Sequence, residues 1–137
     1  MYYWNLSPNL NTSAYNIKGF FLIRNDRKLL NQNNAFIRGG GFATYIHDSY
    51  NYKILKQSKS KNINSIEYLI VEIFHRSTNT IKFLLCPIYR HPNGDLLDSF
   101  FEIIDQFSSS YNIILITGDL NSNLMKNKID ASNLRRL

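Results

Sequence analysis

The residues that most constrain the fold of this chain are 113–121, which read IILITGDLN. This apolar, β-branched run predicts a strand at residues 113–116 that is buried on both faces. Gly118 lets the backbone leave the strand in a conformation that most residues resist. Asp119 and Asn121 follow two positions apart, so on an extended backbone their side chains point the same way.

This segment allows two interpretations. A carboxylate and an amide held side by side at the mouth of a rigid core strand suit acid–base or metal-assisted chemistry. Alternatively, the strand runs into an Asx-type turn in which both side chains bond backbone N–H groups. Residues 113–121 alone favour the turn, so the case for a functional site depends on other parts of the chain.

The remaining sequence predicts one α+β domain. Apolar patterns predict strands at residues 19–24, 41–47, 52–55, 66–74, 81–89 and 112–117. The polar gap at 75–80 predicts an antiparallel hairpin between the two strongest strands. Residues 95–107 have apolar side chains at helical spacing and Asp95 as a suitable N-cap, which predicts a helix. Strands with helices outside the sheets indicate a layered α+β sandwich.

Composition narrows the class of protein. The 137 residues are 44% hydrophobic and 19% charged, which is the balance of one folded domain. The chain has no stretch of eighteen apolar residues, and its start, MYYWNLSPNL, does not have the pattern of a secretory signal. Its single cysteine, Cys86, lies in an apolar strand and is expected to be a reduced core thiol. We therefore expect a nuclear or cytoplasmic protein, neither secreted nor inserted in a membrane.

Positive charge is concentrated in the first half of the chain. Residues 1–68 contain nine Lys and Arg against three Asp and Glu, whereas residues 69–137 contain seven of each. A basic face of this kind would attract a phosphate backbone. The alternative explanation of this positive charge is a genome rich in A and T, because the abundant Asn, Ile and Lys share A/T-rich codons. Four lysines are expected to lie in a solvated loop, with DNA contact as the alternative: Lys53, Lys56, Lys59 and Lys61.

Several motifs occur in a fixed order along the chain. RGGG stands at 38–41, IYRHPN at 88–93 and TGDLN at 117–121, with Trp4-Asn5-Leu6 near the start. This order resembles the endonuclease/exonuclease/phosphatase superfamily, which includes apurinic endonucleases and pancreatic deoxyribonuclease. It is most similar to the apurinic-type endonuclease domain of jockey-like retrotransposons, which lack long terminal repeats. The resemblance covers almost the whole chain.

The resemblance implies a four-layered sandwich of two mainly antiparallel sheets flanked by helices, and a Mg²⁺-dependent site that cleaves DNA. It implies that Asp119 orients or deprotonates the attacking water and that Asn121 orients the phosphate or Asp119. Tyr89 corresponds to a tyrosine that hydrogen-bonds the phosphate, although aromatic residues are common at strand ends. Asn93 corresponds to the asparagine after a proline, with a Pro-Asn-Gly turn as the rival interpretation.

Part of the implied catalytic set is missing from the sequence. The metal-binding Glu should stand just before Thr-Trp-Leu, where this chain has Tyr2-Tyr3. The strand that carries an upstream catalytic Asn has no counterpart, and the closing Ser-Asp-His would lie beyond Leu137. Residues 1–137 are therefore expected to form a partial domain, incomplete at both ends.

Three functions remain open from the sequence. The chain could be a fragment of a metal-dependent DNA endonuclease from a retrotransposon polyprotein that also carries a reverse transcriptase. It could be a catalytically dead remnant with at most non-specific nucleic-acid binding. It could also be a phosphatase of the same fold that acts on small phosphate esters.

Overall fold

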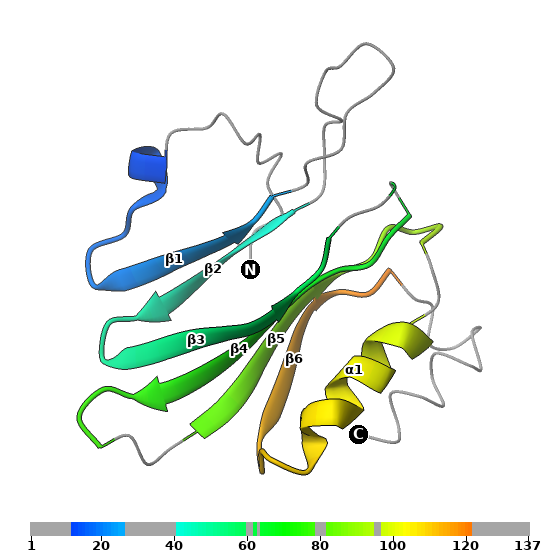
Figure 1. Ribbon diagram of the computed structural model, residues 1–137. Coiled ribbons are helices and arrows are strands. Elements are labelled where there is room, and N and C mark those ends of the chain that lie inside the picture. The colour runs from blue at the N-terminus through cyan, green and yellow to red at the C-terminus, as the bar shows by residue number, and fades with distance from the viewer. Residues whose placement is uncertain are drawn as a thin grey trace.

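The computed structural model of the protein describes residues 12–26, 41–59, 62, 64–78, 82–94 and 97–121. Its elements in chain order are the 3₁₀ helix η1 (Thr12–Tyr15), β1 (Phe20–Asn25), β2 (Phe42–His47), β3 (Tyr50–Gln57), β4 (Glu67–His75), β5 (Lys82–Tyr89), α1 (Asp98–Ser108) and β6 (Ile114–Asp119). The strands form a two-stranded sheet, β1-β2, and a four-stranded sheet in the order β3-β4-β5-β6 (Figure 1). The predicted α+β class is confirmed.

Short connections explain the antiparallel part of the larger sheet. β4 and β5 pair antiparallel across the polar gap, so the predicted hairpin is confirmed. β3 pairs antiparallel with β4 and is longer than the predicted strand at 52–55. β6 instead pairs parallel with β5, because the chain crosses back through α1 before it re-enters the sheet. The carboxyl ends of β5 and β6 therefore lie side by side.

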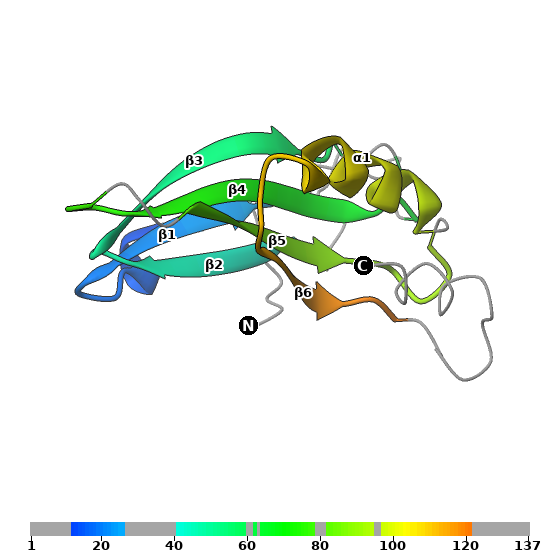
Figure 2. The ribbon, with the colours of Figure 1, turned by 90° about the horizontal axis from the view of Figure 1, so that it is seen from below.

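Each face of the larger sheet carries its own apolar core, so the described residues form three layers. On one face, α1 buries Phe100, Phe101 and Ile104 against the sheet, where their partners include Ile70, Leu84, Cys86 and Ile88. On the other face, β1 and β2 contribute Ile23, Phe42 and Ile46, which pack with Leu69, Val71 and Ile73. Figure 2 shows α1 on one side of the larger sheet and β1-β2 on the other.

The prediction that residues 113–116 form a strand buried on both faces is wrong. Ile114 and Ile116 pack toward α1, but Leu115 is 45% exposed and Ile113 is 50% exposed. β6 is the last strand of its sheet, and the β1-β2 sheet lies against β4 and β5. One face of β6 is therefore left open within the described part of the chain.

Other sequence-based predictions need smaller corrections. The described part of the helix begins at Asp98, whereas the proposed N-cap Asp95 lies outside the described residues. Lys53 and Lys56 belong to β3 and not to a loop, while Lys61 lies outside the described residues. The motifs at 4–6 and 38–40 also lie outside them.

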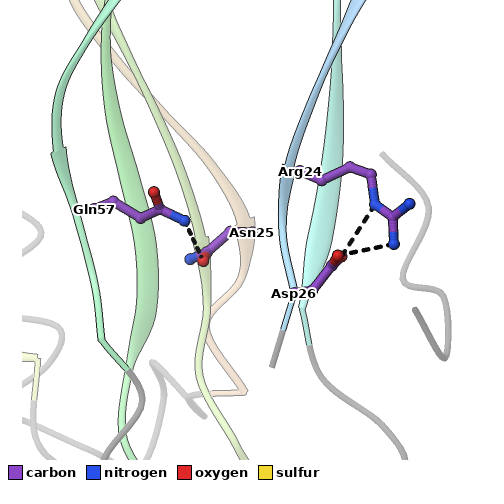
Figure 3. A network of polar contacts seen from close by, with 4 residues as sticks. All are labelled: Arg24, Asn25, Asp26 and Gln57. Carbon is purple, nitrogen blue, oxygen red and sulfur yellow. Dashed lines mark hydrogen bonds and ion pairs between the residues drawn. The ribbon is translucent and has the colours of Figure 1, made fainter. Parts of the chain in front are cut away.

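A polar network joins the two sheets at the end where β1 and β3 finish. Asn25, buried at the end of β1, accepts a hydrogen bond from Gln57 Nε2 at 2.7 Å (Figure 3). Its own Nδ2 donates to Ser58 Oγ at 3.2 Å and to the Tyr68 carbonyl at 3.3 Å. Since a buried amide is costly unless its hydrogen bonds are made, this network fixes how the sheets meet. Tyr89 and Asp119 end their strands at this same end of the molecule.

Candidate functional site

Three polar positions stand in a row across the ends of β4, β5 and β6. Glu67, at the start of β4, pairs with Tyr89, at the end of β5. Tyr89 in turn pairs with Asp119, at the end of β6. The structure therefore brings together Tyr89 and Asp119, two of the residues that the sequence predicted for the site.

Gly118 allows β6 to approach β5 closely just before Asp119. Its φ is +145°, a conformation that residues with a side chain rarely adopt. A Cβ at this position would lie 1.8 Å from the Ile88 carbonyl oxygen. The predicted need for glycine at this exit from the strand is confirmed, and the close approach supplies a second reason for it.

The chain turns sharply after Asp119, so the expectation of an extended backbone through Asn121 is wrong. Asn121 has a φ of +43°, in the left-handed region that asparagine tolerates better than most residues. Its backbone N–H donates to Asp119 Oδ1 at 2.9 Å. This is the Asx-type turn that the sequence allowed as the alternative to a functional arrangement.

Asn121 also ties the turn to the end of β5. Its Nδ2 donates to the carbonyl oxygen of Arg90 at 2.7 Å. In the opposite direction, the Arg90 N–H donates to the carbonyl oxygen of Asp119 at 2.9 Å. Within the described residues, the Asn121 side chain bonds a carbonyl and not an N–H, unlike the simple turn in which both side chains bond N–H groups.

Two side-chain oxygens in this turn remain available. Asp119 Oδ2 and Asn121 Oδ1 accept no hydrogen bond from the described part of the chain, and both residues are partly exposed. A carboxylate oxygen and an amide oxygen can each accept a hydrogen bond or bind a hard cation. The turn interpretation and the functional interpretation are thus compatible, because the turn uses only one oxygen of Asp119.

Tyr89 lies partly buried between the sheets, where it packs against the core that joins β1-β2 to the larger sheet. Glu67, its neighbour in the row, is only 1% exposed. The Glu67 carboxylate accepts a hydrogen bond from the Gly41 N–H at 2.5 Å. Glu67 therefore holds the start of β2 against the row, and it faces the interior.

Asn93 belongs to a turn. The Gly94 N–H donates to the His91 carbonyl at 2.7 Å, and Asn93 itself is exposed. A Pro-Asn pair followed by Gly has the residue types of a β-turn, as the rival interpretation proposed. The described residues give the Asn93 side chain no hydrogen bond to Asp119, Asn121 or Tyr89, so the structure does not join it to the other candidates.

The described residues do not supply a complete metal centre. They contain no group of three or more His, Cys, Asp and Glu side chains that could hold an ion. Asp119 could provide one carboxylate ligand, which falls short of the oxygen-rich shell that Mg²⁺ requires. Cys86 is fully buried, and burial raises the pKa of its thiol to about 12, so it is not a reactive nucleophile.

Two residues that the sequence patterns did not single out lie beside the candidates in the structure. Arg90 is buried, at 6% exposed, although arginine seldom is. Glu67 is buried in the same region. A charged residue beside a continuous apolar run was the available signal, because such a residue at the end of a core strand must find a partner or reach solvent.

Comparison with known proteins adds no assignment: no family model and no curated protein matches the chain. Among the helices that the structure describes, none is long and apolar enough to cross a membrane.

Proposed function

We propose that this chain carries part of the active site of a metal-dependent phosphodiester hydrolase, a DNA endonuclease of the retrotransposon type. The observation that carries the proposal is the pairing of Tyr89 with Asp119 at the end of two parallel strands. The sequence motifs that end these strands are those on which the resemblance rests. DNA is the proposed substrate because the first half of the chain is basic.

Each residue has a chemical role in this proposal. The free oxygen of Asp119 orients the attacking water or takes its proton. The Asn121 amide, whose orientation is fixed by its bond to the Arg90 carbonyl, orients Asp119 or the phosphate. The Tyr89 hydroxyl donates a hydrogen bond to a phosphate oxygen. Mg²⁺ enters through the resemblance alone, and it would neutralise charge on the phosphate.

We further propose that the 137 residues are inactive by themselves. The metal-binding Glu before Trp4 and the closing Ser-Asp-His are not in the sequence. Catalytic groups act as a unit, so the loss of one removes most of the rate. A catalytically dead remnant that at most binds nucleic acid is the second candidate. A phosphatase of the same fold is the third. A nuclear or cytoplasmic location follows for the endonuclease.

The test is plasmid nicking with Mg²⁺. The 137-residue chain is compared with a longer protein in which a segment with the metal-binding Glu precedes Trp4 and a segment with Ser-Asp-His follows Leu137. We expect nicking by the longer protein and none by the shorter one. Failure of both would favour the dead remnant. Nicking by the 137-residue chain that disappears in Asp119→Asn would show that the added segments are dispensable.

A further inference from the structure

Arg90 is a buried cation at the junction of the two loops that follow β5 and β6. Its Nη2 donates to the Gly94 carbonyl at 3.1 Å, which holds the turn at 91–94. Its Nη1 lies 3.4 Å from the Leu120 carbonyl and 3.5 Å from the Asn121 carbonyl, which belong to the other loop. One guanidinium group therefore spans both loops.

The backbone of Arg90 makes further links to the second loop. Its N–H bonds the Asp119 carbonyl, and its own carbonyl accepts the Asn121 side-chain amide. The single residue Arg90 thus bonds Asp119 and Asn121 through its main chain, and Leu120 and Asn121 through its side chain. This concentration of bonds falls on a turn whose left-handed Asn121 needs support from its surroundings.

Only arginine has the donors for this arrangement. A planar guanidinium presents five N–H groups in a fixed fork, so it can serve carbonyls in two directions at once. The ammonium of lysine is a compact point charge with three donors on a flexible stem, and it cannot reproduce the fork. A buried cation is also costly to leave without partners, which ties the side chain to these carbonyls.

We propose that Arg90 is the positioning residue of the candidate site. Its guanidinium fixes the turn at 119–121 relative to the end of β5, and thereby sets the Asn121 amide and the Asp119 carboxylate beside Tyr89. The inference deepens the proposed function and rests on it, because positioning matters to catalysis only if Asp119 and Asn121 act on a substrate. Arg90 itself need not touch that substrate.

The experiment compares the full 137-residue chain with its Arg90→Met and Arg90→Lys variants by NMR. Arg76→Met is the matched control, since Arg76 lies exposed in the turn after β4. The readouts are the side-chain amide signals of Asn121 and hydrogen exchange at the backbone amides of Asn121 and of the middle of β4. A merely structural role for Arg90 would change exchange throughout the sheet.

For Arg90→Met we expect displaced Asn121 side-chain signals and exchange at the Asn121 amide roughly tenfold faster, the scale of one lost hydrogen bond. Exchange at the β4 amides should change by less than about twofold, because their hydrogen bonds are kept. Arg90→Lys should show smaller changes in the Asn121 signals and in Asn121 exchange than Arg90→Met. If Arg90→Met does not fold, Arg90→Lys alone must still displace the Asn121 signals in part.

Unmoved Asn121 signals in the folded Arg90 variants would overturn the proposal, and so would exchange that rises equally in β4. These measurements need neither metal nor DNA. If the longer protein fails to nick plasmid, the proposed function is refuted, but a coupling of Arg90 to Asn121 seen by NMR still stands. If the longer protein nicks plasmid and the Asn121 signals do not move in the Arg90 variants, only the positioning role of Arg90 is refuted.

Discussion

Replacement of Gly118 by alanine should disrupt the candidate site more than the same change at Gly19 or Gly94. The new Cβ would lie 1.8 Å from the Ile88 carbonyl oxygen, whereas ordinary contacts begin at 3.4 Å. β6 must therefore move away from β5, which breaks the pairing that sets Asp119 beside Tyr89. The φ of +145° adds strain for any residue with a side chain.

The magnitude follows from these two effects. A backbone conformation reserved for glycine costs about 1–3 kcal/mol in other residues, and forcing an extra methyl group into a packed site costs about 1–3 kcal/mol. Together they predict a loss of about 2–6 kcal/mol in the free energy of unfolding. Because whole domains are stable by only about 5–15 kcal/mol, Gly118→Ala should remove a large share of the stability and detach β6 from β5.

Gly19→Ala is the matched control. Gly19 also has a positive φ, +82°, but the atom nearest to an added methyl group would be Asp48 Oδ2 at 3.9 Å, an ordinary contact. This variant should therefore lose only the strain contribution, about 1–3 kcal/mol. Urea unfolding followed by circular dichroism measures both variants. A Gly118→Ala protein that loses no more stability than Gly19→Ala would refute the argument from close approach.

Three further outcomes are expected. Duplex DNA should bind the chain weakly and without sequence preference, and fluorescence anisotropy should show the affinity falling between low and high salt; an affinity independent of salt would count against a basic DNA-binding face. Burial, together with the hydrogen bond from the Tyr111 hydroxyl to Glu72 at 2.5 Å and the charge of Glu72, raises the pKa of Tyr111 to about 12. The folded state therefore holds the proton of the Tyr111 hydroxyl more tightly than the unfolded state does. The stability that this hydroxyl contributes is complete below pH ~10 and declines as the pH rises toward 12. Unfolding measured as a function of pH should show a smaller decline for Tyr111→Phe. Cys86 should resist a disulfide reagent at pH ~8, where its buried thiol stays protonated, and react fully in denaturant; rapid reaction of the folded chain would show that β5 opens.

The strands and their order along the chain could be predicted from local sequence patterns. The polar gap between two apolar runs was enough to predict the β4–β5 hairpin, because a short connection can join antiparallel strands but is too short for a parallel crossover. The positions of Tyr89 and Asp119 at the ends of apolar runs were enough to bring them together, because the α1 crossover makes β5 and β6 parallel neighbours.

The features that could not be predicted depend on tertiary contacts. Within the described residues, the open face of β6 reflects its edge position and the small extent of the β1-β2 sheet. An apolar run of residues has the same pattern whether its strand lies at an edge or in a core. The left-handed Asn121 and the burial of Arg90 depend on each other's hydrogen bonds across two loops. The sequence of either loop alone does not predict these hydrogen bonds between Arg90 and Asn121.

The catalytic role of Asp119 is tested most directly by the rate of Mg²⁺-dependent nicking by the longer protein with and without Asp119→Asn. The substitution removes the oxygen assigned to the attacking water while keeping the shape of the side chain. Asp105→Asn, an exposed position on α1, is the control. We predict that Asp119→Asn slows nicking by roughly 10²–10⁴-fold, the contribution of a positioned general base, and that Asp105→Asn leaves the rate unchanged. Equal nicking by the Asp119→Asn protein would contradict the role given to Asp119.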